Sequence, residues 1–285
     1  ENAFVLKKND YYMISCAKHN DATLITMDIG LLGIAKDFVK AEEYKSELIE
    51  EKEIYTGYKK EFVCPSVITK LYSEKYIKDE WNLYPNEFII FTSRENTEHK
   101  AVGIKKKEGI KVCIFDKELN LSKMNTKPIN LEQKMFLYLL QDPEILCVSV
   151  TGISGRGKSL LSTDYAFSQV ELGNYDKFMY TKSIIPVDES EYMGFYKGGP
   201  DEKLTPHLQP LYSCIEYLYK KEIYNKGNDM TISGKFEQLR EHGSLDVFPL
   251  AEIRGMNIFN KIVMLDEAQN TKNHMMKALV SRLTD

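Results

Sequence analysis

The chain has 285 residues, a length that allows two domains, each with a core of its own. Its composition, 43% hydrophobic and 28% charged, is typical of a globular protein, and a formal net charge of −4 argues against a surface that coats nucleic acid throughout. The apolar runs are too short to cross a membrane, and no secretory segment is recognisable. Five scattered cysteines without a C-x-x-C pair predict reduced thiols in a cytoplasmic protein.

The first 44 residues are predicted to form an α/β segment. Helical spacing over 10–19 is followed by a short apolar strand at 22–26 and by a second helical pattern at 31–38. Residues 45–56 continue a densely charged stretch, which predicts a linker or a solvated helix. The opening on Glu1 without a methionine, and the close on KALVSRLTD, predict a piece of a longer protein.

Residues 57–124 are predicted to form a small β-rich module, with strands at 87–93, 100–105 and 111–116. Between 59 and 111 the sequence has 11 Lys or Arg against 8 Asp or Glu, with KKK at 105–107. Two interpretations stay open. In one, the lysines keep a solvated edge strand soluble. In the other, they contact nucleic acid.

Residues 125–285 alternate apolar strands with helices, the pattern of a parallel sheet covered on both faces. The predicted elements, in order, are a helix at 131–140, a strand at 145–151, a helix at 157–171, a strand at 177–181, a helical stretch at 205–225, strands at 247–250 and 261–265, and a final helix.

The strongest motif is GISGRGKS at 152–159, which fits G-x-x-x-x-G-K-[ST]. Glycines let successive backbone N–H groups point at phosphate oxygens, Lys158 can reach the β- and γ-phosphates, and the Ser159 hydroxyl can bind Mg²⁺. The strand before the loop and the helix after it favour this interpretation over a merely connecting glycine-rich loop. The residues predicted to contact the nucleotide are Gly152, Ser154, Gly155, Arg156, Gly157, Lys158, Ser159 and Leu160.

A second motif, KIVMLDEAQN at 261–270, places two acids at the carboxyl end of a buried strand. Asp266 is predicted to hold Mg²⁺ together with Ser159, and Glu267 to act as general base toward the attacking water. The alternative is an ordinary strand that ends in an acidic helix cap. The two motifs together predict that the chain holds a nucleoside triphosphate and hydrolyses it.

Three further residues have two interpretations each. Gln133, ahead of the P-loop, can recognise adenine through its amide, or it can form a capping box with Asn130. Asp10 and Asp28 lie about one helix and one strand apart, so they can meet at a metal ion, although lone acids at helix caps are commoner.

These segments resemble the PhoH-like ATPases, in the form that joins an N-terminal PIN nuclease domain to a P-loop domain. NLEQKMFLYLLQDPEILCVSVTGISGRGKSLL, the stretch at 181–218 and LAEIRGMNIFNKIVMLDEAQN carry the resemblance. Arg156 and Ser159 both stand where threonine is usual in the family, without removing a phosphate contact. The resemblance implies a P-loop NTPase fold like that of superfamily-1 helicases, with a further strand beyond Asp285.

The resemblance also implies roles. Gln133 would select adenine, and Gln269 would sense the γ-phosphate or position water beside the catalytic Lys158 and Glu267. Asp10 and Asp28 would be the third and fourth acids of a PIN metal site whose earlier acids are absent, so no nuclease activity is expected. The expected activity is ATP hydrolysis coupled to RNA remodelling or unwinding, by a homo-oligomeric ring with ATP, Mg²⁺ and RNA as its ligands.

Two other functions stay open. In the first, the chain is an ATP-dependent switch or assembly module without significant turnover. In the second, it is a small-molecule kinase. The long stretch between Ser159 and Asp266 and the lack of a lid-like arginine cluster count against the kinase.

Overall fold

The computed structural model describes residues 8–44, 55–183, 208–225, 230–256 and 258–283, without the side chains of Lys8 and Arg254. The chain divides into two compact units, residues 1–60 and 61–285. The family-like stretch at 184–207 and most of the charged stretch at 45–56 lie outside the described residues. No helix among those described is both long and apolar enough to cross a bilayer.

The first unit is a small α/β layer. Helix α1 (Lys8–His19) leads into β1 (Leu24–Thr26), and α2 (Ile29–Ala35) then connects β1 to β2 (Ala41–Glu43). The two strands pair in parallel, which requires a crossover such as α2 between them. Ile14, Leu31 and Ala35 are buried between the helices and the strands, as expected for an amphipathic helix on a strand pair.

A five-stranded sheet, called here the β-module, follows in the order β3-β5-β6-β7-β4. Its strands and its helix are β3 (Tyr58–Val63), α3 (Pro65–Glu74), β4 (Tyr76–Ile77), β5 (Phe88–Ser93), β6 (Lys100–Lys106) and β7 (Gly109–Val112). One face packs on α3 through a buried apolar cluster that includes Ile68, Leu71, Ile89 and Phe91. The expected strand at 111–116 ends at Val112, and Phe115–Glu118 forms the short helix α4 instead.

The other face of the β-module contacts α5 (Leu131–Leu140). The rings of Phe88, Phe115 and Tyr138 pack edge-to-face or tilted, with centroids 5.6 to 6.5 Å apart. Lys111 Nζ donates to the Tyr138 hydroxyl at 3.0 Å. Lys106 forms an ion pair with Asp142, just after α5. Apolar contact and charge together attach the sheet to this helix.

Two lysines of the run at 105–107 form ion pairs and hydrogen bonds within the molecule. Lys105 pairs with Asp79 at 3.0 Å, and Lys106 donates to Asn86 at 3.1 Å as well as to Asp142. For Lys105 and Lys106 the expectation of a solvated edge strand is wrong, because β6 lies between β5 and β7. Strand β3, which carries Lys59 and Lys60, is an edge strand of the same sheet. Among the residues described, a nucleic-acid contact by this run would have only one unpaired lysine charge left, because Lys105 and Lys106 are already paired with carboxylates.

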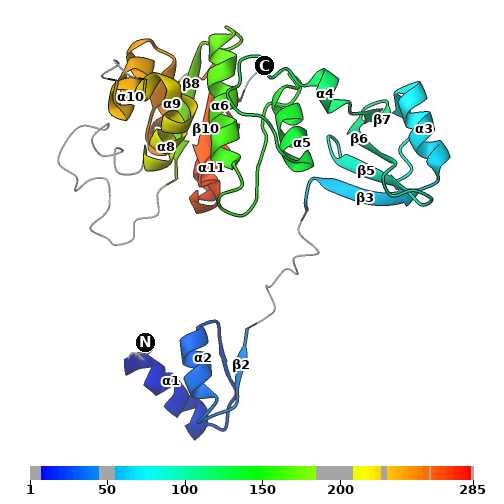
Figure 1. Cartoon of the computed structure of the whole chain (residues 1–285). Helices are drawn as coiled ribbons and strands as arrows, with labels where there is room; N and C mark the ends of the chain where they lie inside the picture. Colours follow the sequence, from blue (N-terminus) through cyan, green and yellow to red (C-terminus); the bar gives the residue numbers. More distant parts are fainter. Residues whose placement is uncertain (1–7, 45–54, 184–207, 226–229, 257, 284–285) are drawn as a thin grey trace. The chain divides into compact units, whose positions relative to one another are not determined.

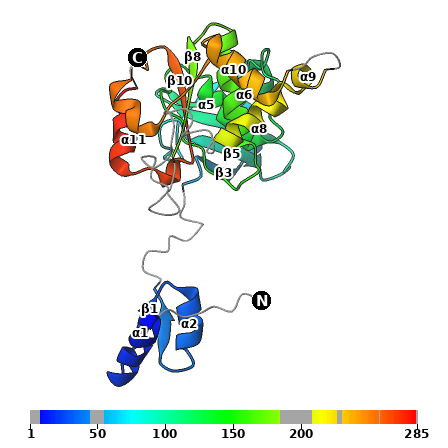
Figure 2. The ribbon, with the colours of Figure 1, turned by 90° about the vertical axis from the view of Figure 1, so that its left-hand side faces the viewer.

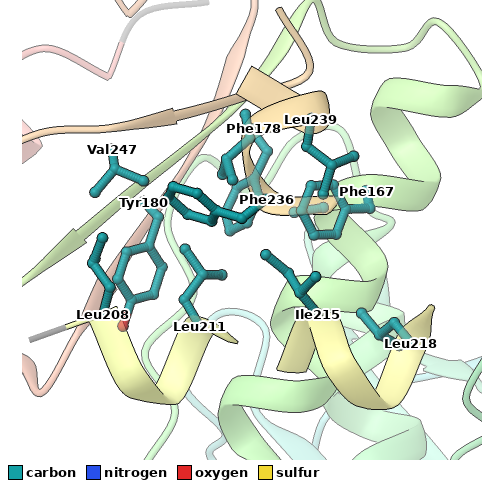
Figure 3. Packing of buried hydrophobic residues seen from close by; sticks show 12 residues of the cluster. Phe167, Phe178, Tyr180, Leu208, Leu211, Ile215, Leu218, Phe236, Leu239 and Val247 are labelled. Atoms are coloured by element: carbon teal, nitrogen blue, oxygen red, sulfur yellow. The ribbon is translucent and has the colours of Figure 1, made fainter. Parts of the chain in front are cut away.

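The third sheet is parallel and has the order β10-β8-β9. It consists of β8 (Lys177–Lys182), β9 (Leu245–Val247) and β10 (Lys261–Asp266). One face packs on α6 (Lys158–Glu171), α8 (Gln209–Leu218) and α10 (Ile232–Glu241), with the short α9 (Lys220–Ile223) between the last two (Figure 1; Figure 3). The opposite face packs on η4 (Leu250–Gly255) and α11 (Asn273–Val280) (Figure 2). The mixed α/β fold with a parallel sheet covered on both faces is confirmed.

The strand expected at 145–151 does not form. Residues 145–153 have no regular structure, and Leu146 and Val150 are 50% and 37% exposed. In the described part of the chain β10 pairs with β8 alone, so the other edge of β10 is not paired with this apolar run. An apolar run becomes a strand only where it pairs with a neighbour, and the local pattern does not show whether it will.

The ion pair between Lys106 and Asp142 makes the stability of the second unit depend on pH. Burial by itself would raise the pKa of Asp142, but the hydrogen bond and charge of Lys106 outweigh it and hold this pKa below the ordinary 3.8. A carboxyl group of this kind contributes stability that is present above its ordinary pKa and is lost as the pH falls through the lowered one.

Asp142→Asn is therefore expected to lower the free energy of unfolding at neutral pH, with a difference from wild type that shrinks as the pH falls below 3.8 and through the lowered pKa of Asp142. Urea unfolding over this pH range measures the difference. Asp116→Asn is the matched control, because its carboxylate pairs with Lys134 but is 86% exposed. A difference for Asp142→Asn that stays constant at all pH values would contradict the assignment.

Candidate functional site

The loop before α6 has the backbone that its glycines permit. Gly155 and Gly157 have φ values of +76° and +83°, and Gly152 has +153°, a region that L side chains rarely adopt. Gly157 is the N-cap residue of α6 and has no side chain to accept the free N–H groups of the first turn. The loop therefore presents backbone donors and the positive end of a helix dipole, which together suit an anion.

Lys158 lies across this loop. Its Nζ donates to the carbonyl oxygens of Gly152 at 2.6 Å and Ile153 at 3.0 Å. The ammonium group is therefore bound by the backbone of its own loop. A phosphate bound there would compete with two carbonyl oxygens for the same ammonium group.

Ser159 and Asp266 are 107 residues apart in the sequence and meet at the carboxyl end of β10. Ser159 Oγ donates to Asp266 Oδ1 at 3.4 Å, and the backbone N–H of Glu267 donates to the same oxygen at 3.2 Å. A hydroxyl and a carboxylate are the oxygen ligands that Mg²⁺ prefers, so these residues fit such a metal. Their role as metal ligands stays a prediction.

The second oxygen of Asp266 has a partner that the sequence did not suggest. The hydroxyl of Tyr180, on β8, donates to Asp266 Oδ2 at 2.9 Å. Burial, followed by the negative charge of Asp266, raises the pKa of Tyr180 well above its usual range. The phenol therefore remains a hydrogen-bond donor. Tyr180 sits within an ordinary apolar strand pattern, which gives no signal of this contact.

Glu267 and Gln269 lie next to this pair. Glu267 has φ +54° and ψ +43°, a left-handed conformation that typically costs ~1–3 kcal/mol outside glycine and persists where the surroundings enforce it. Gln269, in the short η5 (Ala268–Asn270), donates from Nε2 to Glu267 Oε2 at 2.5 Å. The exposed Glu267 carboxylate is thus held by Gln269, on the residue that follows Asp266.

Gln133 joins α5 to the P-loop. Its backbone N–H donates to the N-cap side chain of Asn130 at 2.8 Å, and its Oε1 accepts from Ile129 N at 2.7 Å. Its Nε2 donates to the carbonyl oxygen of Arg156 at 3.2 Å. The cap by Asn130 is thus formed, with Gln133 Oε1 on Ile129 N, one residue before the N–H that a capping box uses. Adenine recognition stays a prediction. In this structure both ends of the amide are engaged.

The other predicted residues are placed as follows. Ser154 and Arg156 are exposed at the tip of the loop. Leu160, in the first turn of α6, packs its side chain against the apolar core. Asp28 accepts from Leu31 N at 3.0 Å and caps α2. Among the residues described, no group of three or more His, Cys, Asp or Glu side chains could hold a metal ion, so metal binding by Asp10 and Asp28 stays a prediction.

A hollow of about 420 Å³ lies elsewhere, in the β-module, and is lined by residues that include Tyr76, Lys78, Asp79, Lys105 and Lys107. Its lysines and acids are mixed, and Lys105 is already paired with Asp79. This hollow contains none of the residues of the P-loop or the acidic motif.

Asp164, on α6, is a second residue that sequence reasoning missed. It is 1% exposed and accepts four hydrogen bonds, from the backbone N–H and the side chains of Asn125 and Thr126, at 2.5 to 3.4 Å. This acid fixes the segment that leads into α5 to the helix that carries the P-loop lysine. An acid within the apolar run LLSTDYAF was the available signal.

Comparison with known proteins identifies the larger part of the chain. The model of the family "PhoH-like protein" matches residues 125–285. Protein PhoH2 of Bacillus subtilis is 28% identical over 304 residues, an alignment that covers 99% of this chain and 66% of that protein. A PhoH-like protein of the same organism is 34% identical over 132 residues, 46% of this chain and 37% of the relative. Protein PhoH2 of Thermobispora bispora is 29% identical over 153 residues, 53% of this chain and 32% of the relative. The chain therefore spans between about one third and two thirds of these curated relatives.

Asp164→Asn is expected to destabilise the second unit strongly. The new amide NH₂ would face N–H donors, and a buried group left without its hydrogen bonds typically costs ~1–3 kcal/mol. Urea unfolding gives the free energy. Asp176→Asn is the control, because that exposed side chain accepts one hydrogen bond, from Asn260. Equal, small effects of both substitutions would show that Asp164 does not fix the segment.

Proposed function

This chain belongs to the PhoH-like protein family, and from that premise we propose that it binds ATP in the loop 152–159 and hydrolyses it. Membership of the family points to a nucleotide-binding protein of the ATPase type. The observation that supports the proposal most directly is the approach of Ser159 to Asp266 at 3.4 Å, beside a loop with free backbone donors. These two motifs are far apart in the sequence and share one site.

The proposed mechanism gives each residue one task. The loop amides and Lys158 bind the β- and γ-phosphates, with Lys158 exchanging its two carbonyl partners for phosphate oxygens. A bound Mg²⁺ would neutralise charge on the triphosphate, and Ser159 with Asp266 would hold it. Glu267 accepts a proton from the water that attacks the γ-phosphorus, and Gln269 positions Glu267 and the water. Gln133 selects adenine by exchanging its present partners for the base.

We further propose that hydrolysis is coupled to RNA remodelling. The contacts that support this step run from the P-loop through Gln133 to α5, and from Tyr138 of α5 to the β-module. A change in the loop on hydrolysis would therefore reach a second sheet. Homo-oligomerisation, with an arginine from a neighbouring subunit completing the site, belongs to the same proposal. So does the assignment of the first unit to a PIN-type domain with Asp10 and Asp28 as metal ligands.

The test is ATP hydrolysis by the chain with and without single-stranded RNA, compared with Lys158→Ala and Glu267→Gln. Each substitution is expected to lower turnover ~100-fold or more, because it removes a phosphate-binding cation or a general base. The exposed Glu241→Gln is the control and is expected to leave turnover unchanged.

Stimulation by RNA that both substitutions abolish supports the coupled motor. Turnover without any response to RNA would rule out the RNA step and leave an ATPase. ATP binding that Lys158→Ala abolishes, in a wild type without turnover, would instead indicate an ATP-dependent switch.

A further inference from the structure

Tyr180 combines complete burial with a contact to the candidate metal ligand. Its side chain is 1% exposed, yet its hydroxyl reaches Asp266 Oδ2 at 2.9 Å. The ring stands among apolar side chains from three elements, including Leu208, Leu211 and Val247, with the hydroxyl at the edge of this cluster (Figure 3). The packing of the core thus places the Tyr180 hydroxyl next to Asp266.

The position of this hydroxyl is fixed by the backbone as well as by packing. Tyr180 lies in the central strand of its sheet, paired with Met264 of β10 on one side and with Val247 of β9 on the other. Its carbonyl oxygen also accepts from Phe248 N at 3.2 Å. Phe178 packs edge-on against its ring at a centroid distance of 6.4 Å. A hydroxyl on such a support has little freedom to move.

The contact helps to fix the orientation of the Asp266 carboxylate toward the loop. With Oδ2 accepting from Tyr180, Oδ1 is the oxygen that accepts from Ser159 Oγ and Glu267 N. Without the hydroxyl, Oδ2 would lose this partner, and only the two hydrogen bonds to Oδ1 would oppose rotation of the carboxylate. Hydrogen bonds to a metal-binding carboxylate commonly set its orientation and the affinity of the site.

We propose that Tyr180 is a positioning residue for the divalent metal of the nucleotide site, because it holds Asp266 with Oδ1 turned toward Ser159. The inference rests on the proposed function, since it assumes that Ser159 and Asp266 bind a metal with the nucleotide. It adds a residue from outside both sequence motifs, and it assigns a functional task to a side chain that otherwise belongs to the core.

Tyr180→Phe is the direct test, because it removes one hydroxyl and keeps the ring. Tyr165→Phe is the matched control. Tyr165 is 3% exposed, and its hydroxyl donates to the backbone oxygen of Leu140 at 2.6 Å, so this variant also loses one buried hydrogen bond, but none to Asp266. Loss of stability alone would affect both variants alike.

Two readouts separate positioning from stability, both with the full chain. The affinity of a fluorescent ATP analogue is measured in EDTA and across a Mg²⁺ titration, and Mn²⁺ binding in the presence of the analogue is followed by electron paramagnetic resonance. Tyr180→Phe is expected to weaken metal binding ~10-fold or more and to leave the metal-free affinity for the analogue unchanged. In an Asp266→Asn background the same substitution is expected to have no further effect on metal binding.

The inference is overturned if the wild type shows metal-dependent binding of the analogue and Tyr180→Phe matches it, or if Tyr165→Phe loses as much metal affinity. A wild type whose binding of the analogue does not depend on metal would overturn the proposed function itself, and this inference with it. The two failures are therefore distinguishable.

Discussion

The register between β10 and β8 is the constraint on which the candidate site depends. Six consecutive pairs run from Lys261 with Lys177 to Asp266 with Lys182, and Ser183 N extends the ladder by donating to Asp266 O. Because side chains alternate along a strand, a slip of one residue would turn Asp266 to the opposite face of the sheet, away from α6. The buried side chains of β8 resist such a slip, since Phe178 and Tyr180 pack toward α6 and α8 while Met179 packs toward α11.

Helix α5 is the second determinant, because it contacts both the β-module and the P-loop. On one side Tyr138 packs between Phe88 and Phe115, and on the other Leu137 is buried against Leu161 of α6. Gln133, at the first turn of the same helix, contacts the loop through Arg156 O. Two lysines of the β-module, Lys106 and Lys111, therefore help to attach the sheet to this helix and to Asp142 just beyond it.

Much of this fold could be predicted from local pattern, and the rest depended on partners that are distant in the sequence. The helix at 131–140 and the strand before Asp266 were predictable because apolar periodicity and N-cap chemistry act within a few residues. The meeting of Ser159 with Asp266 followed from the known geometry of parallel sheets. The lost strand at 145–151 could not be predicted, because pairing depends on a neighbour. The contact of Tyr180 with Asp266 was also hidden, since a tyrosine in an apolar strand looks the same whether or not its hydroxyl reaches a carboxylate.

The two carbonyl oxygens that hold Lys158 affect which anions the loop will retain. A small anion with a single charge would have to displace Gly152 O and Ile153 O and could offer the ammonium little more than those oxygens already do. A polyphosphate can engage several backbone N–H groups of the loop and α6 at the same time as Lys158, so its many contacts outweigh the lost pair. On the proposed function, the loop would thus favour a polyphosphate over a chloride ion before any base is recognised, and its selectivity would begin with the ligand's length.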